Sequence, residues 1–214
     1  MPAGVIVRHM VAAVRNHDGF VTPMAAVAGA VAEEILAAMN SGRSLRRAYV
    51  NNGGDIAFML EPGACFQIGV VNNESLPSPN AQAELRHDEP VRGLATSGWR
   101  GRSHSFGIAD AVTVLARTAA QADVAATLIA GAVNAEDPGI VRKPACELED
   151  DTDLGDRLVT VSVPDLPPEV VAKALDRGGE FARNLLNAGR IEAAYLALQH
   201  ATRTIPSNGE KDLR

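Results

Sequence analysis

Residues 95–110, ATSGWRGRSHSFGIAD, combine hydroxyl-bearing residues, glycines, two arginines and a histidine in one short stretch. The stretch follows a predicted strand and leads directly into a second one at residues 111–116. Glycines let a ligand approach the backbone, and arginines and hydroxyls donate hydrogen bonds to oxyanions. The residue types therefore suit phosphate or another anion, although a solvated loop with ordinary turn chemistry explains them equally well.

The composition around this stretch is that of a globular protein with an aliphatic core. Of the 214 residues, 46% are hydrophobic but only 4% are aromatic, so Ala and Val must supply much of the packing. The formal net charge of −6 argues against a general nucleic-acid binder. It leaves room for a small anionic ligand held by local arginines.

The cysteines and the N-terminus indicate where the protein works. Cys65 and Cys146 make neither a zinc pattern nor a disulfide framework, which favours a reducing cytoplasm. We recognise no signal peptide and no transmembrane segment. The expected location is therefore cytoplasmic, with no membrane partner.

The first half of the chain predicts two helices followed by strands. The helices cover residues 3–15 and 23–40, the second with Thr22 as its N-cap and a proline in its first turn. Residues 48–60 predict a strand, a Gly-Gly turn and a second strand that begins at Asp55. The Asp55 carboxylate could bind backbone amides, ribose hydroxyls or metal-bound water, or simply cap the turn.

Further strands are predicted before the 95–110 stretch. Residues 65–71 read as one strand, and residues 81–86 and 91–96 read as an antiparallel pair around a turn at 87–90. Residues 72–80 read as a polar loop.

A helix over residues 118–134, with Thr118 as its cap, follows the strand at 111–116. It places Asp123 and Thr127 one turn apart on the same face. A carboxylate and a hydroxyl at this spacing can share a Mg²⁺ ion, and they can equally bond to each other.

The C-terminal third reads as an acidic irregular segment at 135–156, a strand at 157–163 and a helical region at 167–200 that is broken near 187–189. The tail from residue 205 looks frayed. We find no linker or repeat, so residues 1–214 are predicted to form a single domain with a C-terminal helical extension at about 167–200.

Three segments occur together in a fixed order: NNGGDI at 51–56, ATSG at 95–98 and ADVAAT at 122–127. This set resembles the ApbE-like superfamily, whose namesakes are FAD:protein FMN transferases. The amino-acid sequence of residues 96–111 is more similar to an uncharacterised branch of that superfamily. The resemblance covers about residues 5–163 and implies an α+β fold, with a mixed, mainly antiparallel sheet flanked by helices.

The resemblance also implies a site for a flavin nucleotide, FAD, together with Mg²⁺. The residues that would face the nucleotide are Asn52, Gly53, Gly54, Asp55, Thr96, Ser97 and Gly98. Asp123 and Thr127 would hold the metal, and a main-chain carbonyl near Ala25 would complete its site. Asp55, Asp110 or His104 would accept the proton of an attacking hydroxyl.

The sequence departs from the transferase pattern in three places. The transferases carry His-x-x-Asp-Pro-x-Thr-Gly where this chain keeps only His104 and Asp110. Their Lys-Gly is replaced by Ala28-Gly29, which leaves Arg100 or Arg102 to supply a cation near the phosphates. The transferases usually have more residues before the first helix. We therefore expect upstream sequence to be absent here, which would leave one side of the cleft unformed.

Three functions remain open on this reading. The first is Mg²⁺-dependent transfer of FMN from FAD to a Ser or Thr of an acceptor protein. The second is a binding module that holds a flavin or another nucleotide without transferring it. The third is metal-assisted hydrolysis of a phosphorylated metabolite. A homodimer is also possible, because the Ala/Val-rich helices could pack within one subunit or between two.

Overall fold

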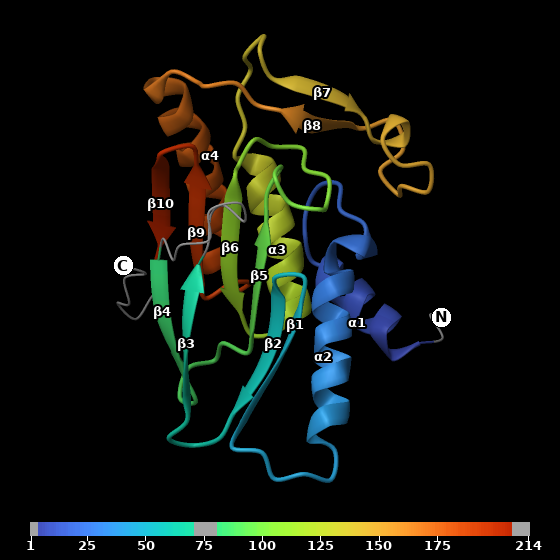
Figure 1. The fold of residues 1–214 in the computed structure, drawn as a ribbon, viewed down its shortest axis with the longest axis vertical. Coiled ribbons are helices and arrows are strands. Elements are labelled where there is room, and N and C mark those ends of the chain that lie inside the picture. The colour runs from blue at the N-terminus through green and yellow to red at the C-terminus, as the bar shows by residue number, and fades with distance from the viewer. Residues whose placement is uncertain (1–3, 71–80, 207–214) are drawn as a thin grey trace.

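The computed structural model describes residues 4–70 and 81–206, and its architecture is α+β, as the sequence predicts (Figure 1). A six-stranded sheet has the strand order β1-β2-β5-β6-β9-β10, and each of its neighbouring pairs is antiparallel. Its strands are β1 (Arg47–Asn52), β2 (Asp55–Leu60), β5 (Gly93–Ser97), β6 (Ala111–Ala116), β9 (Ala193–Leu198) and β10 (Ala201–Ile205).

Two antiparallel hairpins stand beside this sheet. One is formed by β3 (Cys65–Val70) and β4 (Ala81–Arg86), and the other by β7 (Val141–Pro144) and β8 (Leu158–Ser162). In Figure 1 the second hairpin lies across the end of the molecule where the loop between β5 and β6 emerges. The backbone N–H of Thr160 in β8 donates to the carbonyl of Ser105 over 2.8 Å, so β8 fastens that loop.

The helices flank the six-stranded sheet. They are α1 (Val5–Val14), η1 (Pro23–Ala26), α2 (Val27–Asn40), α3 (Ala119–Ala132), η2 (Ala145–Glu147) and α4 (Pro168–Asn187). Thr118 caps α3 as predicted, because its hydroxyl accepts a hydrogen bond from the N–H of Gln121 over 3.2 Å. Thr22 occupies the N-cap position of η1, but its hydroxyl makes no capping hydrogen bond and bonds to the carboxylate of Asp153 instead.

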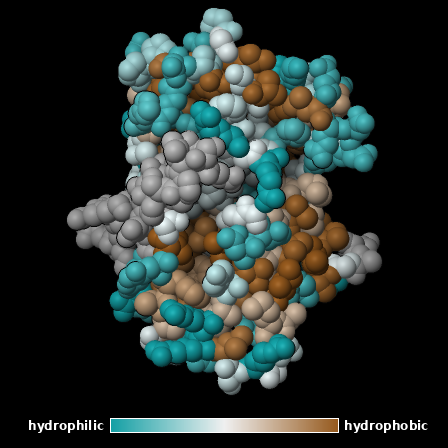
Figure 2. Space-filling view, viewed as in Figure 1, coloured by the Kyte–Doolittle hydropathy of each residue, from teal (hydrophilic) through white to brown (hydrophobic). Residues whose placement is uncertain are grey.

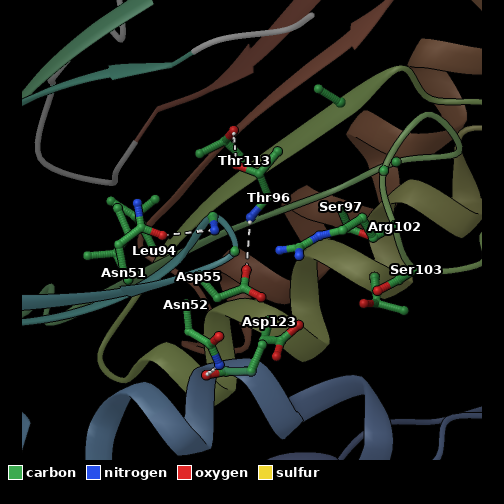
Figure 3. A pocket seen from close by; sticks show the side chains of 18 of the residues that line it. Asn51, Asn52, Asp55, Leu94, Thr96, Ser97, Arg102, Ser103, Thr113 and Asp123 are labelled. Atoms are coloured by element: carbon green, nitrogen blue, oxygen red, sulfur yellow. Dashed lines mark hydrogen bonds between the residues drawn. The ribbon is translucent and has the colours of Figure 1, made fainter. Parts of the chain in front are cut away.

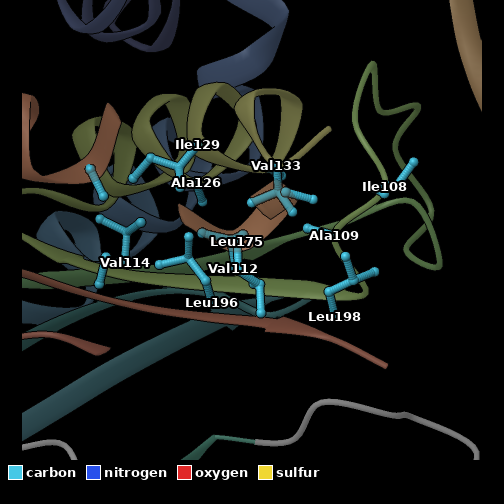
Figure 4. Packing of buried hydrophobic residues seen from close by; sticks show 14 of the residues in the cluster. Ile108, Ala109, Val112, Val114, Ala126, Ile129, Val133, Leu175, Leu196 and Leu198 are labelled. Atoms are coloured by element: carbon cyan, nitrogen blue, oxygen red, sulfur yellow. The ribbon is translucent and has the colours of Figure 1, made fainter. Parts of the chain in front are cut away.

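The main core lies between α3, α4 and the neighbouring strands β6 and β9 (Figure 4). Every residue of both strands is buried, and small alanines on α3 allow the helix to lie close to the sheet. The approach is so close at Gly93 that a Cβ there would lie 2.2 Å from the backbone nitrogen of Ala119. This tight packing fixes α3, and with it Asp123, relative to β5.

The prediction of a helical region at 167–200 is wrong for its second half. Helix α4 ends at Asn187, and residues 193–198 form β9, which pairs with β6 and β10 in the six-stranded sheet. A strand buried on both faces has a continuous apolar run, and periodicity alone cannot separate such a run from a buried helix. The C-terminal third is therefore part of the central sheet, not an appended helical extension.

Two further predictions differ from the structure, and a third concerns residues that the structure does not describe. Residues 81–86 and 93–97 are strands, but β4 pairs with β3 while β5 pairs with β2 and β6, so the predicted pairing is wrong. The Arg92 guanidinium donates to the carbonyls of His87 and Glu89, which directs the chain out of the hairpin. The acidic segment at 135–156 contains β7 and η2, so it is not wholly irregular. The predicted loop at 72–80 lies outside the described residues.

Hydrophobic side chains gather over α2 at the lower right of the face shown in Figure 2. Ile35 and Met39 of α2 are exposed large hydrophobic residues. In the parts of the chain that the structure describes, none of the helices has the length and apolar character required to cross a bilayer.

Candidate functional site

A cavity of about 1020 Å³ opens between the β1–β2 turn, the loop that follows β5, and the facing surfaces of α2 and α3 (Figure 3). The polar residues that line it come from segments far apart in the sequence: Asn51, Asn52, Asp55, Thr96, Ser97, Arg100, Arg102, Ser103, Asp110, Thr113, Asp123 and Thr127. The site therefore depends on the long-range packing of the sheet against α3.

The β1–β2 turn forms one wall. Gly53 and Gly54 have φ values of 72° and 111°, a left-handed conformation that side chains disfavour and tight hairpin turns require. The turn is braced by a hydrogen bond from Gly54 N to Asn51 Oδ1 over 2.9 Å. Asn52 Nδ2 donates to the Ala28 carbonyl over 3.1 Å, so the turn is also fastened to α2. Asp55, the first residue of β2, is thereby held at the cavity.

Asp55 and Asp123 form the electrostatic centre of the cavity. Figure 3 shows the two carboxylates, one from β2 and one from α3, pointing into the same space. Asp55 Oδ1 accepts a hydrogen bond from Thr96 N over 3.3 Å, and Asp123 Oδ2 accepts one from Gly29 N over 3.0 Å. Burial raises the pKa of both carboxyls, and the charge of Asp55 raises the pKa of Asp123 further.

These residues suit a hard divalent cation. Two half-buried carboxylates of like charge are stabilised by a cation or a proton between them. Across the described residues, His, Cys, Asp and Glu side chains form no cluster of three that could hold a metal by themselves. A pair of carboxylates, with the nearby Thr127 hydroxyl and phosphate oxygens of a substrate, is the donor set with which proteins bind Mg²⁺.

Asp110 is engaged by three donors. Its Oδ1 accepts hydrogen bonds from Trp99 Nε1 over 3.1 Å and from Arg100 Nε over 2.7 Å, and its Oδ2 accepts one from the backbone N–H of Gln199. The Arg100 guanidinium also stacks on the Trp99 ring, 4.6 Å from the centroid. Asp110 therefore fixes the shape of the loop, and its charge is compensated by Arg100.

Comparison with protein-family models identifies the family of this chain. The family model described as "AbpE bacteria" matches residues 1–206. The chain belongs to this ApbE-like family. Its match includes the C-terminal strands, so it reaches beyond the three motifs at residues 51–127.

Archaeal relatives of this ApbE-like protein carry the name UPF0280 protein. The relative from Methanopyrus kandleri is 38% identical over 169 residues, which are 75% of this chain and 65% of the relative. The relative from Methanothermobacter thermautotrophicus is 38% identical over 148 residues, 69% of this chain and 56% of the relative. The matches thus span less than two thirds of the relatives' own length.

The cavity of this ApbE-like protein brings together most of the predicted site residues. Those that line it are Asn52, Gly53, Gly54, Asp55, Thr96, Ser97, Gly98, Arg100, Arg102, Asp110, Asp123 and Thr127. Their roles toward a flavin nucleotide or Mg²⁺ stay predictions, but their gathering around one cavity is an observed property of the fold.

Two predicted residues, His104 and Ala25, do not line the cavity. His104 Nε2 lies 3.5 Å from Glu149 Oε2, so the imidazole faces the acidic segment. Ala25 lies in η1, and the cavity is lined instead by Ala28 at the start of α2. The predicted α-helix from residue 23 begins with a 3₁₀ turn, and the α-helix itself starts at Val27.

Several lining residues were missed by the sequence reading. Thr113 lies opposite Thr96 in the β5–β6 register, and their hydroxyl oxygens are 2.8 Å apart. Pairing the two predicted strands would have revealed this contact. Asn51 lies inside the NNGGDI motif, and Trp99 and Ser103 lie inside the 95–110 stretch, but the resemblance assigned none of the three a role.

Proposed function

We propose that this protein binds a flavin nucleotide together with Mg²⁺ and transfers FMN from FAD to a Ser or Thr hydroxyl of a partner protein. The observation that carries the proposal is the pair of half-buried carboxylates, Asp55 and Asp123, directed into one cavity beside the Gly53-Gly54 turn. Membership of an ApbE-like family supports it, because the namesake transferases use corresponding motifs.

Each wall of the cavity has a part in this proposal. Asp123 and Thr127 would hold Mg²⁺ on the side of the cavity opposite Asp55, and the bound ion would offset the negative charge of the FAD pyrophosphate. Thr96 and Ser97 offer hydroxyls at the end of β5, and Arg102 offers a guanidinium. These groups would orient the pyrophosphate for attack.

In the transfer step, the acceptor hydroxyl oxygen forms a bond to the flavin-side phosphorus. The bond from this phosphorus to the bridging oxygen breaks, and AMP leaves with that oxygen. The hydroxyl proton needs an acceptor in the cavity. We assign this role to Asp55, because Asp110 is engaged by three donors and His104 faces Glu149.

A second candidate is a module that holds the flavin nucleotide without transferring it. The surroundings of Asp110 and His104 favour it, because they engage two of the three predicted proton acceptors. This candidate predicts Mg²⁺-assisted binding of FAD with no release of AMP.

The test titrates the purified protein with FAD, with and without Mg²⁺, and measures AMP and flavin attached to a pool of Ser- and Thr-containing peptides. AMP release that Asp123→Ala abolishes, with flavin on peptide, supports transfer. Asp176→Ala is the matched control, because Asp176 is an exposed carboxylate on α4 that pairs with Arg203. FAD binding without AMP favours the holding module, and AMP with free FMN indicates hydrolysis. Absence of FAD binding overturns every flavin function.

A further inference from the structure

The positive charge in the cavity comes from two arginines with different surroundings. Arg100 and Arg102 are the basic residues among those that line it. Arg100 is compensated, since its Nε lies 2.7 Å from Asp110 Oδ1. With the described carboxylates, Arg102 makes no ion pair within 4 Å. Arg102 is therefore the cation of this cavity that can take up a new anionic partner.

The position of Arg102 depends on Gly53. The guanidinium lies against the turn so closely that a Cβ on Gly53 would be 2.1 Å from Arg102 Nη2. Figure 3 shows the side chain extending from the β5–β6 loop across the cavity toward Asp55. Its positive charge favours the ionised form of Asp55 and so acts against the effect of burial on the pKa of that carboxyl.

We propose that Arg102 exchanges between two partners: it faces Asp55 when the cavity holds no nucleotide, and it binds the diphosphate group of a nucleotide when one enters. This inference rests on the proposed function for the identity of the site, but it concerns a diphosphate of any nucleotide. The planar guanidinium suits bidentate contact with phosphate oxygens. Arg102 is exposed on a loop, so it can change partner without disturbing the core.

The exchange has a consequence that a structural role for Arg102 does not share. A cation close to Asp55 repels Mg²⁺ from the carboxylate pair until a diphosphate draws the guanidinium away. Removing Arg102 should therefore have opposite effects on two ligands. Mg²⁺ alone should bind more tightly, and a nucleoside diphosphate should bind more weakly.

The experiment measures the binding of MgCl₂ alone, and of ADP at saturating Mg²⁺, by calorimetry. Trp99 is the sole tryptophan of the chain and lines the cavity, so its fluorescence gives a second readout. We expect Arg102→Ala to tighten Mg²⁺ binding about threefold and to weaken ADP binding at least about tenfold. Arg102→Lys should restore the weaker Mg²⁺ binding and part of the ADP affinity. Arg117→Ala is the matched control, because Arg117 is an exposed arginine that does not line the cavity, and it should change both constants by less than about threefold.

Weaker binding of both ligands to Arg102→Ala would show a merely structural role and overturn the inference. Equal effects of Arg117→Ala and Arg102→Ala, or an unchanged ADP affinity in Arg102→Ala, would overturn it as well. Wild-type protein that binds Mg²⁺ and ADP as expected but does not bind FAD would overturn the flavin function and leave this inference standing. Wild-type protein that binds neither Mg²⁺ nor ADP would overturn both.

Discussion

The backbone N–H of Gly29 donates a hydrogen bond to Asp123 Oδ2 over 3.0 Å and so joins α2 to α3 at the cavity. One residue earlier, the Ala28 carbonyl accepts a hydrogen bond from Asn52 of the β1–β2 turn. The start of α2 thus links the helix that carries Asp123 to the turn that precedes Asp55. The distance between the two carboxylates is set by these backbone contacts.

The first prediction concerns the carboxylate pair and pH. Burial raises the pKa of Asp123 to about 8 and that of Asp55 to about 6, whereas both titrate near pH 3.9 when unfolded. The folded state therefore binds more protons in this window, and the free energy of unfolding without Mg²⁺ falls as the pH rises from about 4 to about 8. Asp123→Asn should raise the free energy of unfolding by about 1–3 kcal/mol at pH 8 and change it little at pH 4.

Urea unfolding at both pH values, in EDTA and in MgCl₂, checks this prediction. Mg²⁺ should stabilise the wild-type protein at pH 8 and leave Asp123→Asn unchanged. The control, Asp176→Asn, removes an exposed carboxylate and should alter the free energy of unfolding by less than about 0.5 kcal/mol. A lower free energy of unfolding for Asp123→Asn than for the wild type at pH 8 would contradict the claim that the two carboxylates destabilise the folded protein at that pH.

The second prediction tests the close approach of α2 to α3. A Cβ on Gly29 would lie 2.4 Å from the carbonyl oxygen of Ala119, so Gly29→Ala must push the helices apart. We expect a loss of about 1–3 kcal/mol in the free energy of unfolding and weaker Mg²⁺ binding, because the N–H that holds Asp123 moves away. Both quantities can be measured on one preparation by urea unfolding and calorimetry.

Gly131→Ala on α3 provides the control for this substitution. Its Cβ would meet nothing nearer than Phe106 Cβ at 3.8 Å, so it should stabilise the helix by about 0.5–1 kcal/mol. If both glycine variants had the same stability, the proposed steric limit at Gly29 would be wrong.

Local features of the fold were predictable from the sequence. The Gly53-Gly54 turn and the Thr118 cap each depend on residues within one turn of the chain, so their patterns indicate the structure directly. The same is true of the spacing that puts Asp123 and Thr127 on one helix face. A family resemblance then indicated that these separate segments meet, which no local pattern can show.

The predictions that failed concern features that depend on packing between segments far apart in the sequence. Residues 193–198, AAYLAL, lack the alternation that identifies a half-buried strand, because neighbouring strands and helices cover both faces of β9. His104 was expected in the cavity because it stands where the transferase pattern has its histidine. Its direction is set by Glu149 and by the bond between Ser105 and β8, and neither contact is visible in the sequence of the loop.

The third prediction separates a positioning role of Asp110 from a catalytic one. Asp110→Asn replaces one carboxylate oxygen by an amide, which cannot accept from every donor that Asp110 now serves. We expect the free energy of unfolding to fall by about 1–3 kcal/mol and the FAD affinity of the folded variant to change less than about threefold. AMP release, where present, should keep its pH profile. A variant of unchanged stability that loses AMP release would instead identify Asp110 as the proton acceptor.

The fourth prediction compares the two glycines of the β1–β2 turn. Both have positive φ, so Gly53→Ala and Gly54→Ala should each lower the free energy of unfolding by about 1 kcal/mol. Only the Cβ at residue 53 meets Arg102, because a Cβ at residue 54 would have nothing within 4 Å. Gly53→Ala should therefore displace the guanidinium and weaken ADP binding about tenfold, whereas Gly54→Ala should keep the wild-type affinity. Trp99 fluorescence titrations of the two variants give the comparison, and equal ADP affinities would mean that the turn does not position Arg102.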